Sequence, residues 1–306
     1  MILVTGATGF VGSEVVRRAS LRGWRVRGLA RRPHLAPTLG RLPHVELFRG
    51  SATDPGDLQQ AMENVTTVLH LVGIIVQTRE QSFHDAHVEA TRAVLEAAER
   101  AGVSRFVHMS ALGVEAGRHV SEYYRTKWQG EELVRASPLD TTIFRPSLVF
   151  GPEDDFFNRF AKIARWSPVV PLPLGGRTRF QPVWVGDVAE CFLQAGRMSH
   201  APEPVYDLAG PEVLTLAEVV RAVQRMTGRP RPTPTVPASL LRLVATVGER
   251  VLPRPPVTVD QLKMMALDNV SNSTALGVLL RDFEIEHAGI EDKAAEWLAP
   301  SSGGTR

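Results

Sequence analysis

The sequence predicts an α/β protein in which a doubly wound parallel sheet is joined to a smaller, mostly helical C-terminal lobe. Two observations carry this prediction. A strand, a glycine-rich turn and a helix open the chain within residues 2–21, an order typical of the first βαβ unit of a Rossmann domain. Short apolar strands then alternate with helices as far as residue 150, and such alternation builds a parallel sheet.

Three glycines in the opening turn have the spacing of a dinucleotide-binding loop. Gly6, Gly9 and Gly12 follow the apolar strand 2–5. Gly6 permits the turn, Gly9 lets a pyrophosphate approach the backbone, and Gly12 lets the helix pack close to the sheet. The helix N-terminus adds N–H groups and a partial positive charge. We therefore expect cofactor contacts from Gly6, Thr8, Gly9, Phe10, Val11 and Gly12; an ordinary structural turn is the alternative.

The other elements of the first half follow from apolar periodicity and turn residues. Further strands are expected at 25–30, 45–49, 67–72, 105–110 and 141–145, and helices at 13–21, 55–63, 82–101 and 121–136. Asp54 is placed to cap the helix that begins at Pro55. These elements complete the predicted Rossmann sheet.

The pattern changes after Gly151-Pro152. Residues 168–173 contain three prolines and cannot form a central strand. A strand-like segment at 180–185 precedes a helix at 187–194, where Asp187 and Glu190 have the spacing of a capping box. A strand at 205–208 and helices at 216–226, 239–251 and 259–267 follow. We assign residues 1–150 and about 179–200 to the dinucleotide-binding domain, and 151–178 and 201–306 to a substrate or lid domain.

Composition excludes several classes of function. The chain has 306 residues, 43% of them hydrophobic and 22% charged, with a net charge of +2, which gives no reason to expect nucleic-acid binding. No apolar run reaches the ~18 residues of a membrane span. The first strand begins at residue 2 and leaves no room for a signal peptide, so a cytoplasmic location is expected. Cys191 lies in an apolar helical pattern and is expected in the core. The oligomeric state is left open.

A tyrosine and a lysine are the second chemical signal. Tyr123 and Lys127 are four residues apart in a predicted helix and therefore share a face. A phenol with a pKa of about 10 is a poor acid–base group at neutral pH, and a nearby ammonium lowers that pKa. The alternative is a Tyr and a Lys on a solvated helix face.

These motifs resemble the short-chain dehydrogenase/reductase family in its extended or atypical form. The strand end His70-Leu71-Val72-Gly73, Arg145-Pro146 and Gly151-Pro152 support the resemblance, which covers roughly residues 1–210. Strings at 106–113, 144–147, 181–183 and 258–262 resemble the atypical, epimerase/dehydratase-like branch that includes the dinucleotide-binding accessory subunit of respiratory complex I.

The resemblance implies one of two functions. The first is an oxidoreductase or epimerase that transfers hydride and a proton on a small carbonyl or hydroxyl compound, with Tyr123, Lys127 and Ser110 as catalytic residues. The second is a non-catalytic nucleotide-binding structural or sensor protein, like the complex I accessory subunit. In either case the resemblance implies further cofactor contacts from Ser51, Ala52, Leu71, Val72, Gly73, His87, Met109, Lys127 and Pro146.

Three positions depart from the family pattern. Ala111 stands where extended members have their catalytic serine, so Ser110 is the substitute, and a plain strand-end hydroxyl is the alternative. His87 stands where many extended members have asparagine. The usual Gly-Asp after the third strand is Gly50-Ser51 here. His84, Asp85 and His87 resemble a metal cluster only superficially, because no further ligand has a suitable spacing, and we expect no metal.

The predicted cofactor is NADP(H) rather than NAD(H). An NAD enzyme usually has an acidic residue at the end of the second strand, whereas here that strand is followed by Arg31 and Arg32. Guanidinium groups suit a 2′-phosphate; two solvated surface arginines are the alternative.

Substrate and partner residues are less clearly marked. A small-molecule substrate is expected between the two lobes, where position alone suggests Gln77, Thr78, Asn158, Arg179 and Gln181 as lining residues. The apolar stripe at 239–251 predicts a lid helix over the cleft. A membrane-surface or complex-docking helix is the alternative.

Overall fold

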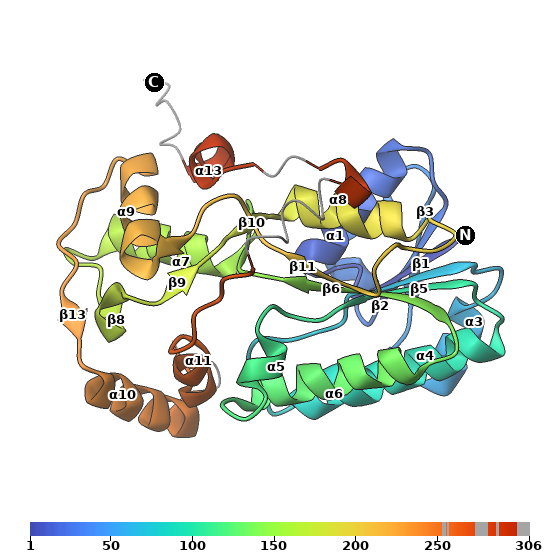
Figure 1. Cartoon of the computed structure of the whole chain (residues 1–306), viewed down its shortest axis with the longest axis horizontal. Helices are drawn as coiled ribbons and strands as arrows, with labels where there is room; N and C mark the ends of the chain where they lie inside the picture. The colour runs from blue at the N-terminus through green and yellow to red at the C-terminus, as the bar shows by residue number, and fades with distance from the viewer. Residues whose placement is uncertain (253–254, 256, 273–280, 286–287, 299–306) are drawn as a thin grey trace.

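A seven-stranded sheet forms the centre of the larger lobe (Figure 1), and each neighbouring pair of its strands is parallel. In spatial order the strands are β11 (Val205–Leu208), β6 (Asp140–Pro146), β5 (Arg105–Met109), β4 (Thr67–His70), β1 (Ile2–Thr5), β2 (Val26–Ala30) and β3 (Val45–Arg49). The computed structural model describes residues 1–252, 255, 257–272, 281–285 and 288–298. The predicted α/β fold is confirmed.

Helices cover both faces of this sheet. One face carries α1 (Phe10–Leu21) and α8 (Val185–Ala195), and the other carries α3 (Pro55–Ala61), α4 (Ala90–Arg100) and α6 (Glu122–Ala136) (Figure 1). In β1, Ile2 and Val4 pack into the core beside α1 and α8, whereas Leu3 packs into the core on the opposite face. This burial on both sides explains why the central strands are continuously apolar. The short helices η1 (Pro33–Leu35), α2 (Pro37–Gly40) and α5 (Val114–Gly117) lie in connections.

The smaller lobe has its own apolar core. It contains three two-stranded sheets, formed by β7 (Val149–Phe150) with β10 (Val183–Trp184), β9 (Arg179–Phe180) with β12 (Leu214–Thr215), and β8 (Leu172–Pro173) with β13 (Thr235–Val236). Its helices are α7 (Asp155–Trp166), η3 (Leu174–Gly176), α9 (Leu216–Met226), α10 (Ala238–Val251), α11 (Val259–Met264) and α13 (Ile290–Leu298). Phe150, Phe157 and Val219 lie in its core. Among the described helices none is long and apolar enough to cross a bilayer.

Several local expectations are met and others are not. Asp54 caps α3 by accepting a hydrogen bond from Asp57 N. The strand-like segment 180–185 is divided between β9 and β10, and α8 begins at Val185. Asp187 and Glu190 therefore lie inside α8, and the expected capping box is wrong. β11, from the segment assigned to the lid domain, pairs with β6 in the main sheet; the last eight residues of that segment lie outside the described residues.

The helix predicted at 82–101 contains a π-helical turn near its start, η2 (Asp85–Glu89), that continues into α4. Such turns often occur at functional sites. The turn lies against α6, where a Cβ on Gly130 would be 2.4 Å from the His87 carbonyl oxygen. Only glycine permits this approach, which brings η2 and α6 together beneath the strand ends.

Candidate active site

The carboxyl ends of the central strands meet at one edge of the sheet. Gly6 follows β1 with a φ of 72°, and a Cβ there would lie 2.8 Å from the Leu71 carbonyl oxygen after β4. Lys127 from α6 donates from Nζ to the Met109 carbonyl oxygen at 3.0 Å. A Cβ on Gly73 would lie 3.0 Å from the same Nζ. Three strand ends and one helix thus converge at the edge where α/β folds bind nucleotides.

The start of α1 fits a pyrophosphate. Gly9 is the N-cap residue, and within the described chain no side chain caps this helix end. Gly9 and Thr8 are exposed, and a Cβ on Gly9 would meet only the Gly6 carbonyl oxygen, at 3.2 Å. The first N–H groups of α1 are therefore available for phosphate oxygens.

Two other predicted contacts in this loop pack into the protein. The Phe10 ring packs against Gly151, and Val11 is buried in the core. Both residues shape the cradle through packing, and the side chain of Val11 is buried away from a ligand.

A pocket with two arginines lies where β2 and β3 end. It is lined by Arg31, Arg49, Gly50, Ser51 and Asp57. Asp57 accepts a hydrogen bond from Ser51 N at 2.8 Å. An acidic group therefore lies close to Ser51, which stands in place of the Asp of the usual Gly-Asp motif. Ala52 packs against the core beside it.

The sequence did not identify Arg49, although the pairing of Ala30 with Arg49 in the sheet brings it beside Arg31. Arg32, in contrast, forms an exposed ion pair with Glu80 at 3.9 Å. The structure thus brings together Arg31 and Arg49 rather than Arg31 and Arg32.

Lys127 is a buried cation. Its side chain lies between the Met109 carbonyl and Gly73, and burial lowers its pKa to about 8. At neutral pH most of the lysine still carries its charge, since the pKa lies above 7. The buried ammonium therefore has donors left for ligand oxygens at the strand ends.

Tyr123 lies among aromatic rings at the start of α6. Its ring makes edge contacts with Phe83 at 5.7 Å and with His87 at 5.4 Å between ring centroids. Burial, with a smaller contribution from Tyr124, raises the pKa of Tyr123 above its ordinary value. The spacing predicts that Lys127 lowers this pKa, but the Lys127 ammonium donates to the Met109 carbonyl and burial of Tyr123 dominates. The phenol is protonated and can act as a proton donor.

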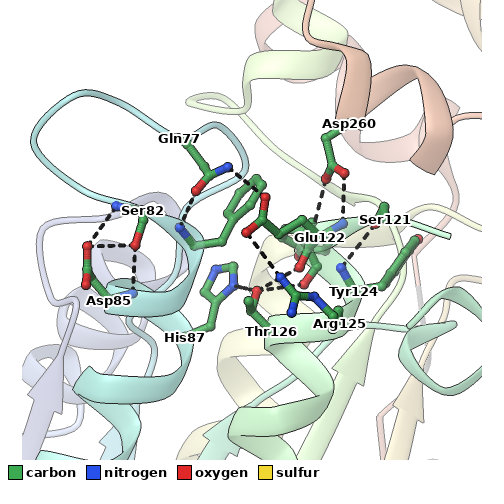
Figure 2. Close-up of polar contacts among 12 residues, drawn as sticks. Gln77, Ser82, Asp85, His87, Ser121, Glu122, Tyr124, Arg125, Thr126 and Asp260 are labelled. Atoms are coloured by element: carbon green, nitrogen blue, oxygen red, sulfur yellow. Dashed lines mark hydrogen bonds and ion pairs between the residues drawn. The ribbon is translucent and has the colours of Figure 1, made fainter. Parts of the chain in front are cut away.

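His87 lies beneath the site as a neutral side chain. Its Nδ1 is 2.9 Å from Thr126 Oγ1 (Figure 2), and its Nε2 is 3.1 Å from the Ile74 carbonyl oxygen. Burial first, and then the charge of Lys127, lower its pKa to about 2. His84 pairs with Glu89 and Asp85 with Ser82, so the three residues of the superficial metal cluster have separate partners.

Ser110 belongs to a buried polar network. Its hydroxyl donates to Glu131 Oε2 at 2.7 Å. Glu131 is fully buried and also accepts hydrogen bonds from Arg145 at 2.6 Å and Arg135 at 2.8 Å.

Ala111 is buried against Val114 and Tyr124. Pro146, at the end of β6, is buried and its carbonyl accepts from Leu112 N. Val72, after β4, is half-buried.

Two strand histidines were not identified from the sequence as part of this region. His70 and His108 are paired in register in β4 and β5, and their rings stack at 5.4 Å. His70 is hydrogen bonded to Thr5 and Thr91, and burial lowers its pKa to about 3. His108 has no hydrogen-bond partner among the described residues. The apolar residues around both histidines predict that β4 and β5 are buried strands. They do not predict that the charge of Lys127 acts on both rings.

The residues suggested as substrate lining have protein partners. Gln77 donates to Glu122 (Figure 2), and Arg179 forms an ion pair with Asp268. The other three are also hydrogen bonded within the protein: Thr78 to Gln81, Asn158 to Asp154, and Gln181 to Gly210.

The apolar stripe of α10 faces solvent. The exposed fractions of Leu243 and Val251 are 60% and 70%, and Leu240, Val244 and Val247 are also exposed. The helix lies at the far end of the smaller lobe (Figure 1) and is buried only at Ala245 and Gly248. These side chains therefore do not cover a cleft as the lid interpretation expected.

Comparison with known proteins agrees with this geometry. A family model described as NAD(P)H-binding matches residues 6–155. The mitochondrial NADH dehydrogenase [ubiquinone] 1 alpha subcomplex subunit 9 of Mus musculus is 31% identical over 304 residues, which cover 96% of this chain and 78% of the mouse protein. The chain belongs to the extended short-chain dehydrogenase/reductase family. Within that family it resembles the complex I accessory subunits.

Another relative of this chain is named as an enzyme, and a solved structure shares its fold. A ceramide reductase of Caulobacter vibrioides is 33% identical over 189 residues, covering 62% of this chain and 58% of that protein. The structure of MoeE5 in complex with UDP-glucuronic acid and NAD has a TM-score of 0.74, with 21% identity and coverage of 97% of this chain and 98% of that one. This structural likeness confirms the fold.

The buried carboxylate of Glu131 makes a prediction for stability. Burial alone would raise its pKa, but hydrogen bonds from Arg145, Ser110 and Arg135 outweigh burial and hold the pKa below its ordinary value. Glu131→Gln should destabilise the protein at neutral pH by about 3 kcal/mol, because charged partners lose their acceptor. The lowered pKa means that the folded protein stabilises the ionised carboxylate, and this stabilisation is lost as Glu131 becomes protonated. The difference in unfolding free energy between the wild type and Glu131→Gln should therefore shrink as the pH falls below about 4.

Urea unfolding at several pH values measures this difference. Glu132→Gln, at the exposed neighbouring position, is the matched control and should have little effect. A deficit in Glu131→Gln that is the same at neutral and acid pH would contradict the assignment.

Proposed function

We propose that this protein is an NADP(H)-dependent oxidoreductase or epimerase that acts on a small carbonyl or hydroxyl compound, with Tyr123 as the proton donor and acceptor. The observation that carries this proposal is the shared helix face of Tyr123 and Lys127 at the strand ends, where the phenol is protonated and the ammonium is buried beside Gly73 and Met109.

Each residue has a distinct role in this proposal. The first turn of α1 and Gly9 hold the pyrophosphate, and Lys127 holds the nicotinamide ribose hydroxyls. The bound nicotinamide supplies or accepts the hydride. Tyr123 gives its proton from Oη to the substrate oxygen during reduction and receives it in the reverse direction. The neutral ring of His87, fixed by Ile74 and Thr126, gives Tyr123 a rigid wall.

Preference for NADP(H) rests on the pocket between β2 and β3. Arg31 and Arg49 are both exposed and line this pocket. Paired guanidinium groups bind a phosphate through charge-assisted hydrogen bonds. The carboxylate of Asp57, by comparison, already accepts Ser51 N. The pocket therefore favours a 2′-phosphate.

Replacing both arginines should separate the two cofactors. Arg31→Ala with Arg49→Ala should weaken NADPH binding by about 10- to 100-fold, since a hydrogen bond to a charged group contributes about 1.5–3 kcal/mol, and should leave NADH binding nearly unchanged. Calorimetric titration with each nucleotide measures this. Arg32→Ala, at the arginine paired with Glu80, is the control. Equal losses for NADPH and NADH would show that these arginines do not contact the 2′-phosphate.

Removing the phenol should remove the chemistry and spare the binding. Tyr123→Phe should lower turnover by about 10²- to 10⁴-fold, the usual contribution of a general acid–base group, with NADPH affinity unchanged. Lys127→Ala should weaken both. The measurement is NADPH affinity and turnover of a carbonyl substrate found by screening at the nicotinamide absorbance.

Tyr124→Phe is the matched control, because the neighbouring phenol is hydrogen bonded to Asn269 and has no proposed role in proton transfer. It should keep turnover close to that of the wild type. Unaltered turnover in Tyr123→Phe would refute the acid–base assignment.

A nucleotide-binding subunit without catalysis is the second candidate. Two observations favour it: Ala111 in place of the family's serine, and the exposed apolar face of α10, which would suit contact with another component of an assembly. The mouse relative named as a complex I subunit supports the same function. In that case NADPH would raise the melting temperature although the wild type turned over no substrate.

A further inference from the structure

The N-terminus of α6 is capped by a residue from the opposite lobe. Ser121 N donates to the Gly117 carbonyl at 3.1 Å, and Tyr124 N donates to Ser121 Oγ at 3.2 Å. The two N–H groups between them, of Glu122 and Tyr123, donate to the carboxylate of Asp260 at 2.8 Å and 3.1 Å (Figure 2). All four donors of this helix end, which an α-helix cannot satisfy internally, therefore have acceptors.

Asp260 comes from α11, far along the chain from α6. It lies in the first turn of α11, whose own N-cap is Thr258, so one carboxylate faces the positive ends of two helices. Negative charge is favourable at both ends. α11 is held in turn by α10, because Glu249 accepts a hydrogen bond from Val259 N at 2.8 Å. The contact ties the smaller lobe to the helix that carries Tyr123 and Lys127.

The contact fixes the backbone of Tyr123 itself. Its N–H donates to Asp260 Oδ2, and its carbonyl accepts from Thr126 Oγ1 at 3.1 Å. Thr126 is held by His87 Nδ1 on the far side at 2.9 Å. With both backbone polar groups held, the direction of the Tyr123 Cα–Cβ bond is set. A displacement of about 1 Å in a reacting group can cost 10²-fold in rate.

We propose that Asp260 is a positioning residue that holds Tyr123 in its reactive orientation by capping α6 from the smaller lobe. The importance of this orientation for catalysis rests on the proposed function, whereas the hydrogen bonds from α6 to Asp260 do not depend on it. Asp260 touches neither the cofactor cradle at Gly9 nor the arginine pocket. Its removal should therefore affect proton transfer and leave nucleotide affinity in place.

Asparagine is the informative replacement. An amide has nearly the size of a carboxylate, but one of its two polar atoms is a donor. In Asp260→Asn, the amide oxygen can accept a hydrogen bond from one of the two backbone N–H groups of α6. The amide nitrogen then faces the other backbone N–H, and both groups are donors. The matched control is Glu249→Gln. It makes the same carboxylate-to-amide change on α10, at the residue that accepts a hydrogen bond from Val259 N, and it leaves α6 capped.

The experiment combines three measurements on the full chain. Hydrogen–deuterium exchange of peptides covering 120–127 should be about 10-fold faster in Asp260→Asn and unchanged in Glu249→Gln. NADPH affinity by calorimetry should match the wild type. Turnover on the screened carbonyl substrate should fall by about 10- to 100-fold, and should fall no further when Asp260→Asn is added to Tyr123→Phe.

The outcomes separate the two ideas. Wild-type exchange at 120–127 in Asp260→Asn overturns the cap. Faster exchange with wild-type turnover overturns the positioning role, and so does a loss that adds in full to that of Tyr123→Phe. Unaltered turnover in Tyr123→Phe refutes the proposed function, whatever the exchange shows. If Asp260→Asn fails to bind NADPH through misfolding, Asp260→Ser, whose single short hydroxyl cannot accept from both N–H groups, is measured in its place with the same criteria.

Discussion

The buried ammonium of Lys127 is the constraint on which the rest of this site depends. A charge removed from water costs several kcal/mol unless polar groups replace the lost hydration, and here the Met109 carbonyl supplies one such bond. The surrounding basic groups must then be neutral. Burial and the lysine charge lower the pKa values of His70 and His87. The pKa of His108 is lowered as well. Burial is the largest cause of the lowered pKa in all three histidines, and the charge of Lys127 adds to it.

The same helix arranges the site at three levels. Tyr123, Lys127 and Glu131 are spaced four residues apart on α6 and share a face. Tyr123 faces the aromatic wall, Lys127 reaches the strand ends, and Glu131 anchors the helix to Arg145 through a buried ion pair. Gly130 lets this face approach η2 closely. The helix is thus held along its length by charge and close packing, and Asp260 holds its first turn.

Local patterns predicted the larger lobe well. The strand, glycine turn and helix at the N-terminus follow from short-range spacing and are present in the structure. Tyr123 and Lys127 both lie on α6, as their spacing predicts. Arg49 and Asp260 could not be found in this way, because their roles come from pairing of strands and from contact between lobes. The pKa of Tyr123 also differs from the expectation, because burial raises it. Spacing shows that two side chains share a face, but it does not show that burial outweighs their mutual charge effect.

The smaller lobe differs from the larger one in how it uses apolar residues. Its core is closed around Phe150 and Phe157, yet α10 leaves a row of large apolar side chains in solvent. Singly exposed apolar residues are ordinary, whereas a contiguous row on one helix is typical of contact surfaces. The helix is linked to the site through Glu249, α11 and Asp260. A contact made at α10 therefore has a physical connection to Tyr123.

A crystal structure of the protein with NADP⁺ bound would test the proposed site most directly. We expect the pyrophosphate at the start of α1, the 2′-phosphate between Arg31 and Arg49, and the nicotinamide beside Tyr123 with its ribose on Lys127. A nicotinamide bound away from Tyr123, with the adenosine half in place, would contradict the catalytic role and leave a protein that only binds the nucleotide.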